Sequence, residues 1–246
     1  MAESGIPVLA IDLDAQQHMT KCLGVESNLN TPSAYEVLVE NQDINTVIKK
    51  TKLQTLDVIP GNIKLSVIEN RIPNKEMKEF LLTSALNKIK CKDYKIIVID
   101  SLPNITLLNK NAILACDDLL IPVLPDFLSF DGLGLLFEEL TRMEKTYAIY
   151  TDFRGGLLDN IYVILNQYRP NEIMSKQNKA ALEKYYANYF CETVIFYNTK
   201  ITQATAAGKP IFQYCRSCTG AKQIRQLVDE ILQFNPSGHK RGRKRE

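Results

Sequence analysis

The sequence has no apolar run long enough to cross a bilayer, and its first residues lack a basic segment ahead of an apolar stretch. A membrane-spanning helix needs about 20 consecutive apolar residues, so we expect neither an integral membrane protein nor a cleaved secretion signal. We expect a soluble protein of the cytoplasm. With 246 residues, 45% of them hydrophobic, the chain can bury one large core.

Histidine is scarce, with two residues, and the six cysteines are scattered through apolar segments. This distribution is typical of reduced thiols in an intracellular protein, so we expect no disulfide bonds. Cys215 and Cys218 have a metal-like spacing. A zinc site would need a second pair of ligands, which His18 and His239 do not supply well, and two unrelated thiols are the favoured interpretation.

Positive charge is concentrated at the C-terminus. Residues 239–246 carry a net charge of +4, and since the whole chain carries +2, the rest sums to −2. The basic residues of this tail are Lys240, Arg241, Arg243, Lys244 and Arg245. We predict a disordered tail over 236–246 that binds DNA, with a merely solubilising tail as the alternative. The tail has no bulky apolar residues, which disfavours a role at a membrane surface.

Two hydrophobic patterns alternate along the chain. Short runs rich in Val and Ile predict buried strands over 7–13, 56–59, 94–99, 119–123, 161–165 and 193–196. Apolar residues three and four apart predict helices over 75–89, 106–115, 131–147, 172–189 and 220–234. The alternation predicts one doubly wound α/β domain over 1–235, with a mostly parallel sheet and helices on both faces. Ligands of such domains bind beyond the carboxyl ends of the strands.

Carboxylates follow two of the predicted strands. Asp12 and Asp14 come after the first strand, and Asp100 ends the strand predicted over 94–99. An Asp at the end of a buried strand is costly unless it is paired, caps a helix or lies close to a cation such as Mg²⁺. For Asp100 alone, a helix cap or turn residue is about as good an interpretation as a metal ligand.

Several segments occur in an order that resembles a known family. Residues 8–16 form an apolar strand followed by Asp-x-Asp-Ala-Gln, and residues 94–103 form a second strand that ends in Asp-Ser-Leu-Pro. Residues 107–112, 118–123, 131–133 and 198–221 supply the matching later elements. These resemble the A′ motif, the Walker B segment, the following helix and strand, and the C-terminal signature of the ParA/Soj/MinD-type deviant Walker ATPases.

The chain also departs from that family. Ala15 replaces the usual Pro, and Lys200 stands where the signature usually has Arg. The 246 residues contain no G-x-x-x-x-G-K-[ST] or K-G-G-x-G-K-[ST], the loop whose backbone N–H groups and lysine hold the β- and γ-phosphates. In the family this loop precedes the A′ motif by about one helix, so here we expect it upstream of Met1.

Residues 2–7 are typical of the last turn of a helix, with Gly5 at the C′ position and Pro7 beyond it. The resemblance implies that the missing segment also supplies a central strand, and its loss would leave two apolar strand edges unpaired. Three explanations stay open. The start codon is misplaced, a natural variant has lost nucleotide binding, or a separate polypeptide supplies the loop.

The resemblance implies ATP hydrolysis at a dimer interface. Asp14 would orient or activate the attacking water, and Asp12 and Asp100 would hold Mg²⁺ through water or a hydroxyl. Asn166 resembles the position that contacts the base, with a turn-forming Asn as the alternative. Candidate contacts to DNA phosphates are Lys200, Arg216, Lys222 and Arg225, with plain surface charge as the alternative for Arg216 and Lys222.

We therefore expect a ParA-like plasmid or chromosome partition protein. It would dimerise with ATP and Mg²⁺, bind DNA without sequence specificity, associate with the nucleoid and act with a ParB-like centromere-binding partner. The alternative is a non-catalytic ParA-like regulator that binds DNA or a partner and has lost nucleotide binding. A MinD-like protein positioned on membranes is a third possibility, which the composition of the tail disfavours.

Overall fold

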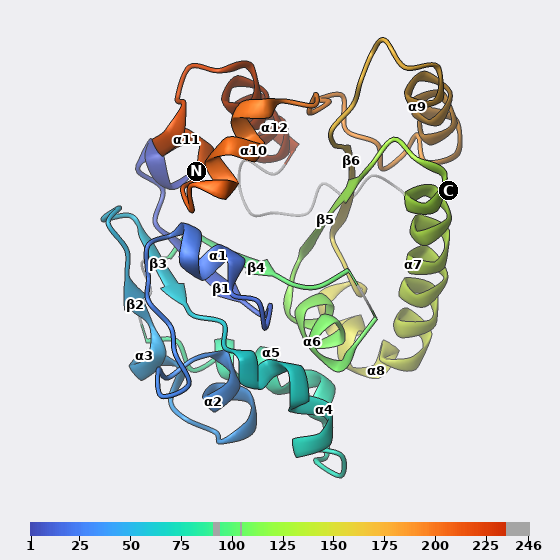
Figure 1. Ribbon diagram of the computed structural model, residues 1–246. Helices are drawn as coiled ribbons and strands as arrows, with labels where there is room; N and C mark the ends of the chain where they lie inside the picture. The colour runs from blue at the N-terminus through green and yellow to red at the C-terminus, as the bar shows by residue number, and fades with distance from the viewer. Residues whose placement is uncertain (91–93, 104, 235–246) are drawn as a thin grey trace. The chain divides into compact units, whose positions relative to one another are not determined.

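The computed structural model describes residues 1–90, 94–103 and 105–234 (Figure 1). The described chain divides into two compact units, which we call the N-terminal unit (residues 1–116 and 208–210) and the C-terminal unit (residues 117–207 and 211–234). The domain boundaries expected from the sequence, 1–235, stay a prediction. The basic tail predicted over 236–246 lies outside the described residues.

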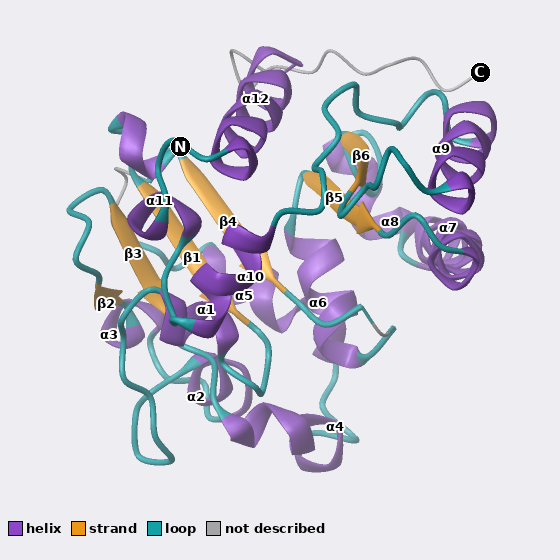
Figure 2. Cartoon of the chain, turned by 45° about the horizontal axis from the view of Figure 1, so that its top comes forward, coloured by secondary structure: helices purple, strands orange, loops and turns teal. Residues whose placement is uncertain are grey.

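The N-terminal unit is built on a four-stranded sheet in the order β2-β3-β1-β4 (Figure 2). The inner strand β1 (Val8–Asp12) pairs in parallel with β3 (Leu56–Ile59) on one side and β4 (Ile96–Asp100) on the other. The short strand β2 (Lys49–Lys50) pairs antiparallel with β3. All five residues of β1 are buried, as the Val- and Ile-rich run predicted.

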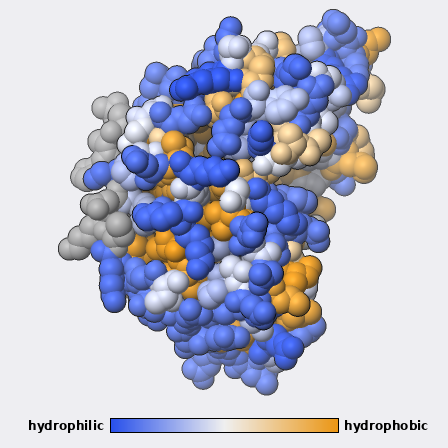
Figure 3. Space-filling model, turned by 60° about the vertical axis from the view of Figure 1, so that its left-hand side comes forward, coloured by the Kyte–Doolittle hydropathy of each residue, from blue (hydrophilic) through white to orange (hydrophobic). Residues whose placement is uncertain are grey.

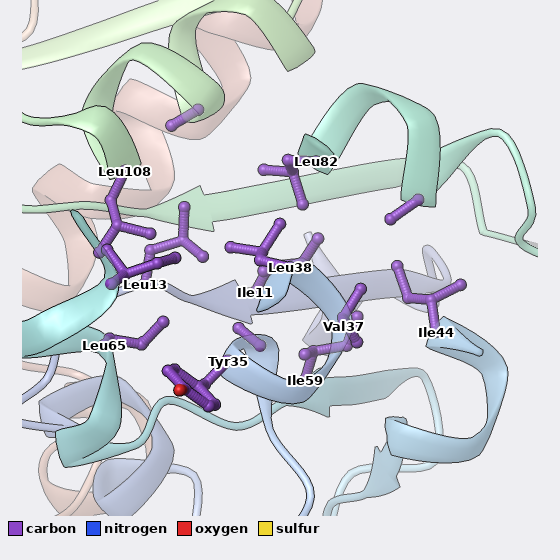
Figure 4. Close-up of a cluster of buried hydrophobic side chains, with 14 of the residues drawn as sticks. Ile11, Leu13, Tyr35, Val37, Leu38, Ile44, Ile59, Leu65, Leu82 and Leu108 are labelled. Atoms are coloured by element: carbon purple, nitrogen blue, oxygen red, sulfur yellow. The ribbon is translucent and has the colours of Figure 1, made fainter. Parts of the chain in front are cut away.

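Short helices pack on this sheet. They are α1 (His18–Cys22), α2 (Ala34–Val39), α3 (Ile44–Val47), α4 (Ile68–Arg71), α5 (Leu81–Leu86) and α6 (Leu107–Ala115), with 3-10 helices at Ala2–Ser4, Ile63–Val67 and Lys78–Phe80. A capping box formed by Ser33 and Glu36 starts α2. Ile11 of β1, Leu38 of α2 and Leu82 of α5 belong to one buried cluster (Figure 4).

The C-terminal unit contains the parallel strand pair β5 (Asp118–Val123) and β6 (Asn160–Leu165). Its helices are α7 (Phe127–Thr146), α8 (Ala148–Thr151), α9 (Ile173–Tyr185), α10 (Thr199–Ala206), α11 (Ile211–Tyr214) and α12 (Thr219–Phe234), with a 3-10 helix at Asp152–Arg154. The helix α7 begins four residues before the predicted start, because the side chain of Asp126 caps it by accepting a hydrogen bond from the N–H of Ser129. Within the described ranges, the helices are too short or too polar to span a bilayer.

The strand predicted over 193–196 is not formed as a strand of a sheet. The segment lies extended beside β6, where the N–H of Ile195 donates to the carbonyl of Leu165 at 2.9 Å. An isolated parallel bridge joins Tyr168 to Phe196. Two further backbone hydrogen bonds, both with Tyr168, form this single bridge, and one bridge does not extend the sheet. The prediction was therefore correct about extended backbone and wrong about a strand.

β4 and β5 are among the strands that lie at a sheet edge. Among the described residues, β4 pairs only with β1, and β5 pairs only with β6. Ile97 and Val98 of β4 are 39% and 42% exposed, although strands of parallel sheets are normally buried on both faces. The expectation that a missing segment leaves two apolar edges unpaired stays a prediction. Apolar side chains reach the surface elsewhere too, as separate patches on the face shown in Figure 3.

Candidate functional site

Asp12 ends β1 and is fully buried. Its Oδ2 accepts hydrogen bonds from the backbone N–H of Thr20 at 2.8 Å and from Oγ1 of Thr20 at 2.6 Å, and its Oδ1 accepts one from the N–H of Asp14 at 3.0 Å. A carboxylate has about four positions at which it can accept a hydrogen bond, so these three bonds leave one position unoccupied. Asp12 thereby holds the turn between β1 and α1.

Thr20 links this turn to the carboxyl end of β3. Its Oγ1 accepts a hydrogen bond from the N–H of Gly61 at 3.0 Å. There is no room for a side chain at Gly61, since a Cβ there would lie 2.6 Å from the carbonyl oxygen of Asp14 and 3.0 Å from Cγ of Asp12. Thr20 and Gly61 therefore fix the ends of two adjacent strands.

Asp14 lies in the turn after β1 and is 9% exposed. Its Oδ1 accepts a hydrogen bond from the N–H of Gln16 at 2.8 Å, and its Oδ2 lies 3.4 Å from Nδ1 of His18. Gln17, with φ 62°, has left-handed backbone and directly precedes α1. The turn thus holds the carboxylate of Asp14 in one orientation at the carboxyl end of β1.

Asp100 ends β4 directly beside Asp12 in the parallel register. Its carbonyl oxygen accepts a hydrogen bond from the N–H of Leu13 at 2.9 Å, whereas its carboxylate has no hydrogen bond or ion pair with any described residue. Partial desolvation raises the pKa of Asp100, and the negative charges of Asp12 and Asp14 raise it further, against a smaller opposing effect of His18.

These three carboxylates form a negative cluster at the carboxyl ends of two adjacent strands. Within the described residues no Lys or Arg forms an ion pair with them. A nearby cation would stabilise the ionised form of these carboxylates. No group of three or more His, Cys, Asp and Glu is arranged to hold a metal by itself in the described ranges. The donors nevertheless fit Mg²⁺, which usually binds through one or two carboxylates, with water and phosphate completing its shell.

Asn166 follows β6 in the C-terminal unit. Its N–H donates to the carbonyl of Val123 at 2.8 Å, and its Oδ1 accepts from the N–H of Gln167, whose φ is 56°. This geometry is that of a turn-forming Asn, one of the two roles expected. Its proposed contact with a base stays a prediction.

The four candidate DNA contacts among the described residues lie in the C-terminal unit. Lys200 on α10, Arg216 before α12, and Lys222 on α12 are exposed, and Arg225 on α12 is half-buried. Arg225 donates from Nη1 to the carbonyl of Arg216 at 2.9 Å, and its guanidinium lies 4.7 Å from the centre of the Phe212 ring. Because residues three apart share a helix face, Lys222 adds its charge beside Arg225.

The start of α12 packs closely on α10, which places Lys200 in the same region. A Cβ at Gly220 would lie 2.7 Å from Cδ1 of Ile201, so a larger residue there would require the side chain of Ile201 to shift. The structure thus brings the four basic residues to one part of the C-terminal unit. The tail residues Lys240, Arg241, Arg243, Lys244 and Arg245 lie outside the described residues.

The sequence predictions missed Thr20 and Gly61 as parts of the site. Gly61 directly follows the predicted strand 56–59, and a glycine at the carboxyl end of a strand often marks a close backbone approach, so this signal was available. Thr20 carries no such signal, because its partner Gly61 is 41 residues away in the chain.

Comparisons with known proteins identify relatives over nearly the whole chain. The cell division protein PomZ of Myxococcus xanthus is 36% identical over 232 residues, covering 94% of this chain and 70% of PomZ. The sporulation initiation inhibitor protein Soj of Bacillus subtilis is 30% identical over 231 residues, covering 94% of this chain and 88% of Soj.

Solved structures confirm the fold class, a mostly parallel sheet with helices around it. A plasmid partition protein from Borrelia burgdorferi gives a TM-score of 0.71 at 22% identity, covering 94% of this chain and 86% of that one. A cobyrinic acid a,c-diamide synthase from Mycobacterium smegmatis, with bound ATP analog and magnesium, gives 0.78 at 22% identity, covering 97% and 86%. The sequence model of a family described as an AAA domain matches residues 1–152. The chain therefore belongs to the ParA-type ATPase family.

Proposed function

We propose that this chain is a ParA-like partition or positioning protein that dimerises with ATP and binds DNA without sequence specificity, once a glycine-lysine loop completes its site. The observation that carries the proposal is the carboxylate cluster of Asp12, Asp14 and Asp100 at the carboxyl ends of β1 and β4. Ligands of doubly wound domains bind at this end of the sheet. The similarity to PomZ and Soj supports the same function.

The three carboxylates have different roles in this proposal. Asp14 would orient or deprotonate the attacking water, because the N–H of Gln16 fixes its Oδ1 while the carboxylate stays close to solvent. Asp100 would hold Mg²⁺, since its carboxylate has no hydrogen bond or ion pair with another residue that the structure describes. Asp12 has one free acceptor position and would act through a water or the Thr20 hydroxyl. Bound Mg²⁺ supplies charge neutralisation at the phosphates.

The DNA-binding part of the proposal rests on the basic residues of the C-terminal unit and tail. Lys200, Arg216 and Lys222 are exposed to solvent, and contacts to phosphates carry no sequence information. Asn166 would contact the base of the nucleotide. A ParB-like centromere-binding protein is the proposed partner, and association with the nucleoid the proposed location.

A second candidate is a non-catalytic ParA-like regulator that binds DNA or a partner and has lost nucleotide binding. The gene sequence directly upstream of the codon for Met1 discriminates between the two. An in-frame glycine-lysine loop there supports the ATPase, and an in-frame stop codon supports the regulator.

The 246-residue chain should bind MgATP weakly or not at all. Backbone N–H groups and the lysine of the loop supply most of the phosphate contacts in P-loop proteins, and the carboxylate cluster by itself repels a polyphosphate. Isothermal titration calorimetry measures this directly. A micromolar dissociation constant would overturn the prediction and would mean that another segment holds the phosphates.

Deleting residues 239–246 should weaken DNA binding and its dependence on salt. The five Lys and Arg residues of this segment can each release counterions from DNA, so the logarithm of the affinity falls more steeply with salt when they are present. Fluorescence anisotropy with two unrelated duplexes, at several salt concentrations, gives both quantities. An unchanged affinity and an unchanged salt slope would show that the tail is only a solubilising end.

A further inference from the structure

Cys215 and Cys218 lie in one tight turn between α11 and α12. The N–H of Cys218 donates to the carbonyl of Cys215 at 3.3 Å, which closes a four-residue turn. Such a turn brings its first and last Cα atoms within about 7 Å, and disulfides typically join Cα atoms about 4.4–6.8 Å apart. The turn therefore brings the two backbones into the range of separation in which a disulfide can form.

The two thiols also point into the same surroundings. Both side chains pack against the apolar cluster formed by Ala204, Ile211 and Ala221. Both residues are half-buried, so a small reagent can reach them, whereas Cys191 is buried. The five described cysteines are free thiols: Cys22, Cys116, Cys191, Cys215 and Cys218. Among the residues that the structure describes, no third His, Cys, Asp or Glu joins the pair as a metal ligand. Two neighbouring thiols can react with each other by oxidation to a disulfide.

We propose that Cys215 and Cys218 form a reversible dithiol that closes into a disulfide on exposure to a small-molecule disulfide. The bond would fix the turn that carries Arg216, one of the proposed DNA contacts, to the first residues of α12. The inference needs neither nucleotide nor DNA, so it stands or fails independently of the proposed function.

The reaction is a two-step thiol–disulfide exchange. The thiolate of one cysteine attacks a sulfur of the small disulfide, which forms a mixed disulfide and releases one small thiol. The thiolate of the second cysteine then attacks the protein sulfur of that mixed disulfide and releases the second small thiol. The protein loses two hydrogen atoms, and the small disulfide is reduced to two thiols.

The test is to incubate the native 246-residue protein with oxidised glutathione, then count free thiols and measure the intact mass. Two of the six thiols should be lost, and the mass of the protein should fall by about 2 Da. No glutathione should remain covalently attached to these two cysteines. Peptide mapping should place the bond between Cys215 and Cys218, and dithiothreitol should reverse it. The mixed disulfide at Cys215 or Cys218 should not accumulate in the parent protein, because the second step is intramolecular and faster than the bimolecular first step.

Cys215→Ser and Cys218→Ser should each abolish the internal bond and leave a glutathione adduct on the remaining cysteine. The matched control is Cys22→Ser, which removes a half-buried thiol of the N-terminal unit and should leave the bond unaffected. Circular dichroism of each variant checks that it is folded. The proposal is overturned if folded parent protein keeps all its thiols, accumulates only glutathione adducts, or forms its disulfide between other cysteines.

Discussion

Replacing Asp14 by Ala should lower the rate of ATP hydrolysis by about 10²–10⁴, the usual contribution of a positioned general base. The measurement requires the chain extended at its N-terminus by a glycine-lysine loop from its own gene or from a relative. ATP binding and dimerisation should persist in the variant, because in the proposed mechanism the loop would hold the phosphates and Asp14 would act on the attacking water. Steady-state hydrolysis and nucleotide affinity, measured on the same preparation, separate the two effects.

Asp100→Ala is the companion variant in the extended protein. Because the proposed role of Asp100 is to hold Mg²⁺, its loss should weaken the Mg²⁺-dependent part of ATP binding rather than the chemical step alone. Similar losses of ATP affinity in Asp14→Ala and Asp100→Ala would contradict the separate roles that the site geometry supports.

Replacing Asp12 by Ala should lower the free energy of unfolding by at least roughly 3 kcal/mol. The substitution leaves the N–H and hydroxyl of Thr20 and the N–H of Asp14 without their acceptor in a buried site, and each unsatisfied group costs about 1–3 kcal/mol. For a chain of this size the melting temperature should fall by roughly 10 °C. Urea unfolding followed by circular dichroism gives the free energy.

Asp100→Asn is the matched control, and its effect on stability should have the opposite sign at pH 7. Desolvation and the charges of Asp12 and Asp14 raise the pKa of Asp100 in the folded protein, so its ionised form costs stability above that raised pKa. The cost disappears as the pH falls below 3.8, the ordinary pKa of an aspartate, because the carboxyl is then protonated in both states. Asp100→Asn should therefore stabilise the protein at pH 7 and have no such effect near pH 3.

These variants also test whether the carboxylates have functional roles. If Asp12→Ala, Asp14→Ala and Asp100→Ala destabilised the protein equally, all three would be turn or capping residues, and the case for catalysis would fall. The structure predicts unequal effects, since Asp12 accepts three buried hydrogen bonds and the carboxylate of Asp100 accepts none.

Buried strands could be predicted well from the sequence, and short helices could not. Runs of Val and Ile identified β1, β3, β4, β5 and β6 to within two residues, because strands buried on both faces are continuously apolar. Helices of four to six residues, such as α1 and α3, are too short to show a 3.6-residue period. The start of helix α2 could have been predicted from the capping box of Ser33 and Glu36, a sequence feature separate from apolar periodicity.

The sequence predicted the site residues that lie at strand ends, and it missed those that are brought together by long-range packing. Placing Asp12 and Asp100 together follows from the rule that parallel strands share a carboxyl end, and their register pairs them directly. The hydrogen bond from Gly61 to Thr20 joins residues far apart in the chain, and no local pattern encodes it. The family resemblance, rather than periodicity, supplied the chemical roles of Asp14 and Asn166.

We propose that this chain contributes the carboxylate half of an ATPase site, which a glycine-lysine loop would complete. Calorimetry with MgATP on two proteins, the 246-residue chain and the same chain extended by the loop, tests this directly. We expect a dissociation constant on the order of micromolar for the extended protein, which is about −8 kcal/mol, and little or no heat for the shorter one. Equal affinity in both proteins, or no binding by a folded extended protein, would contradict it.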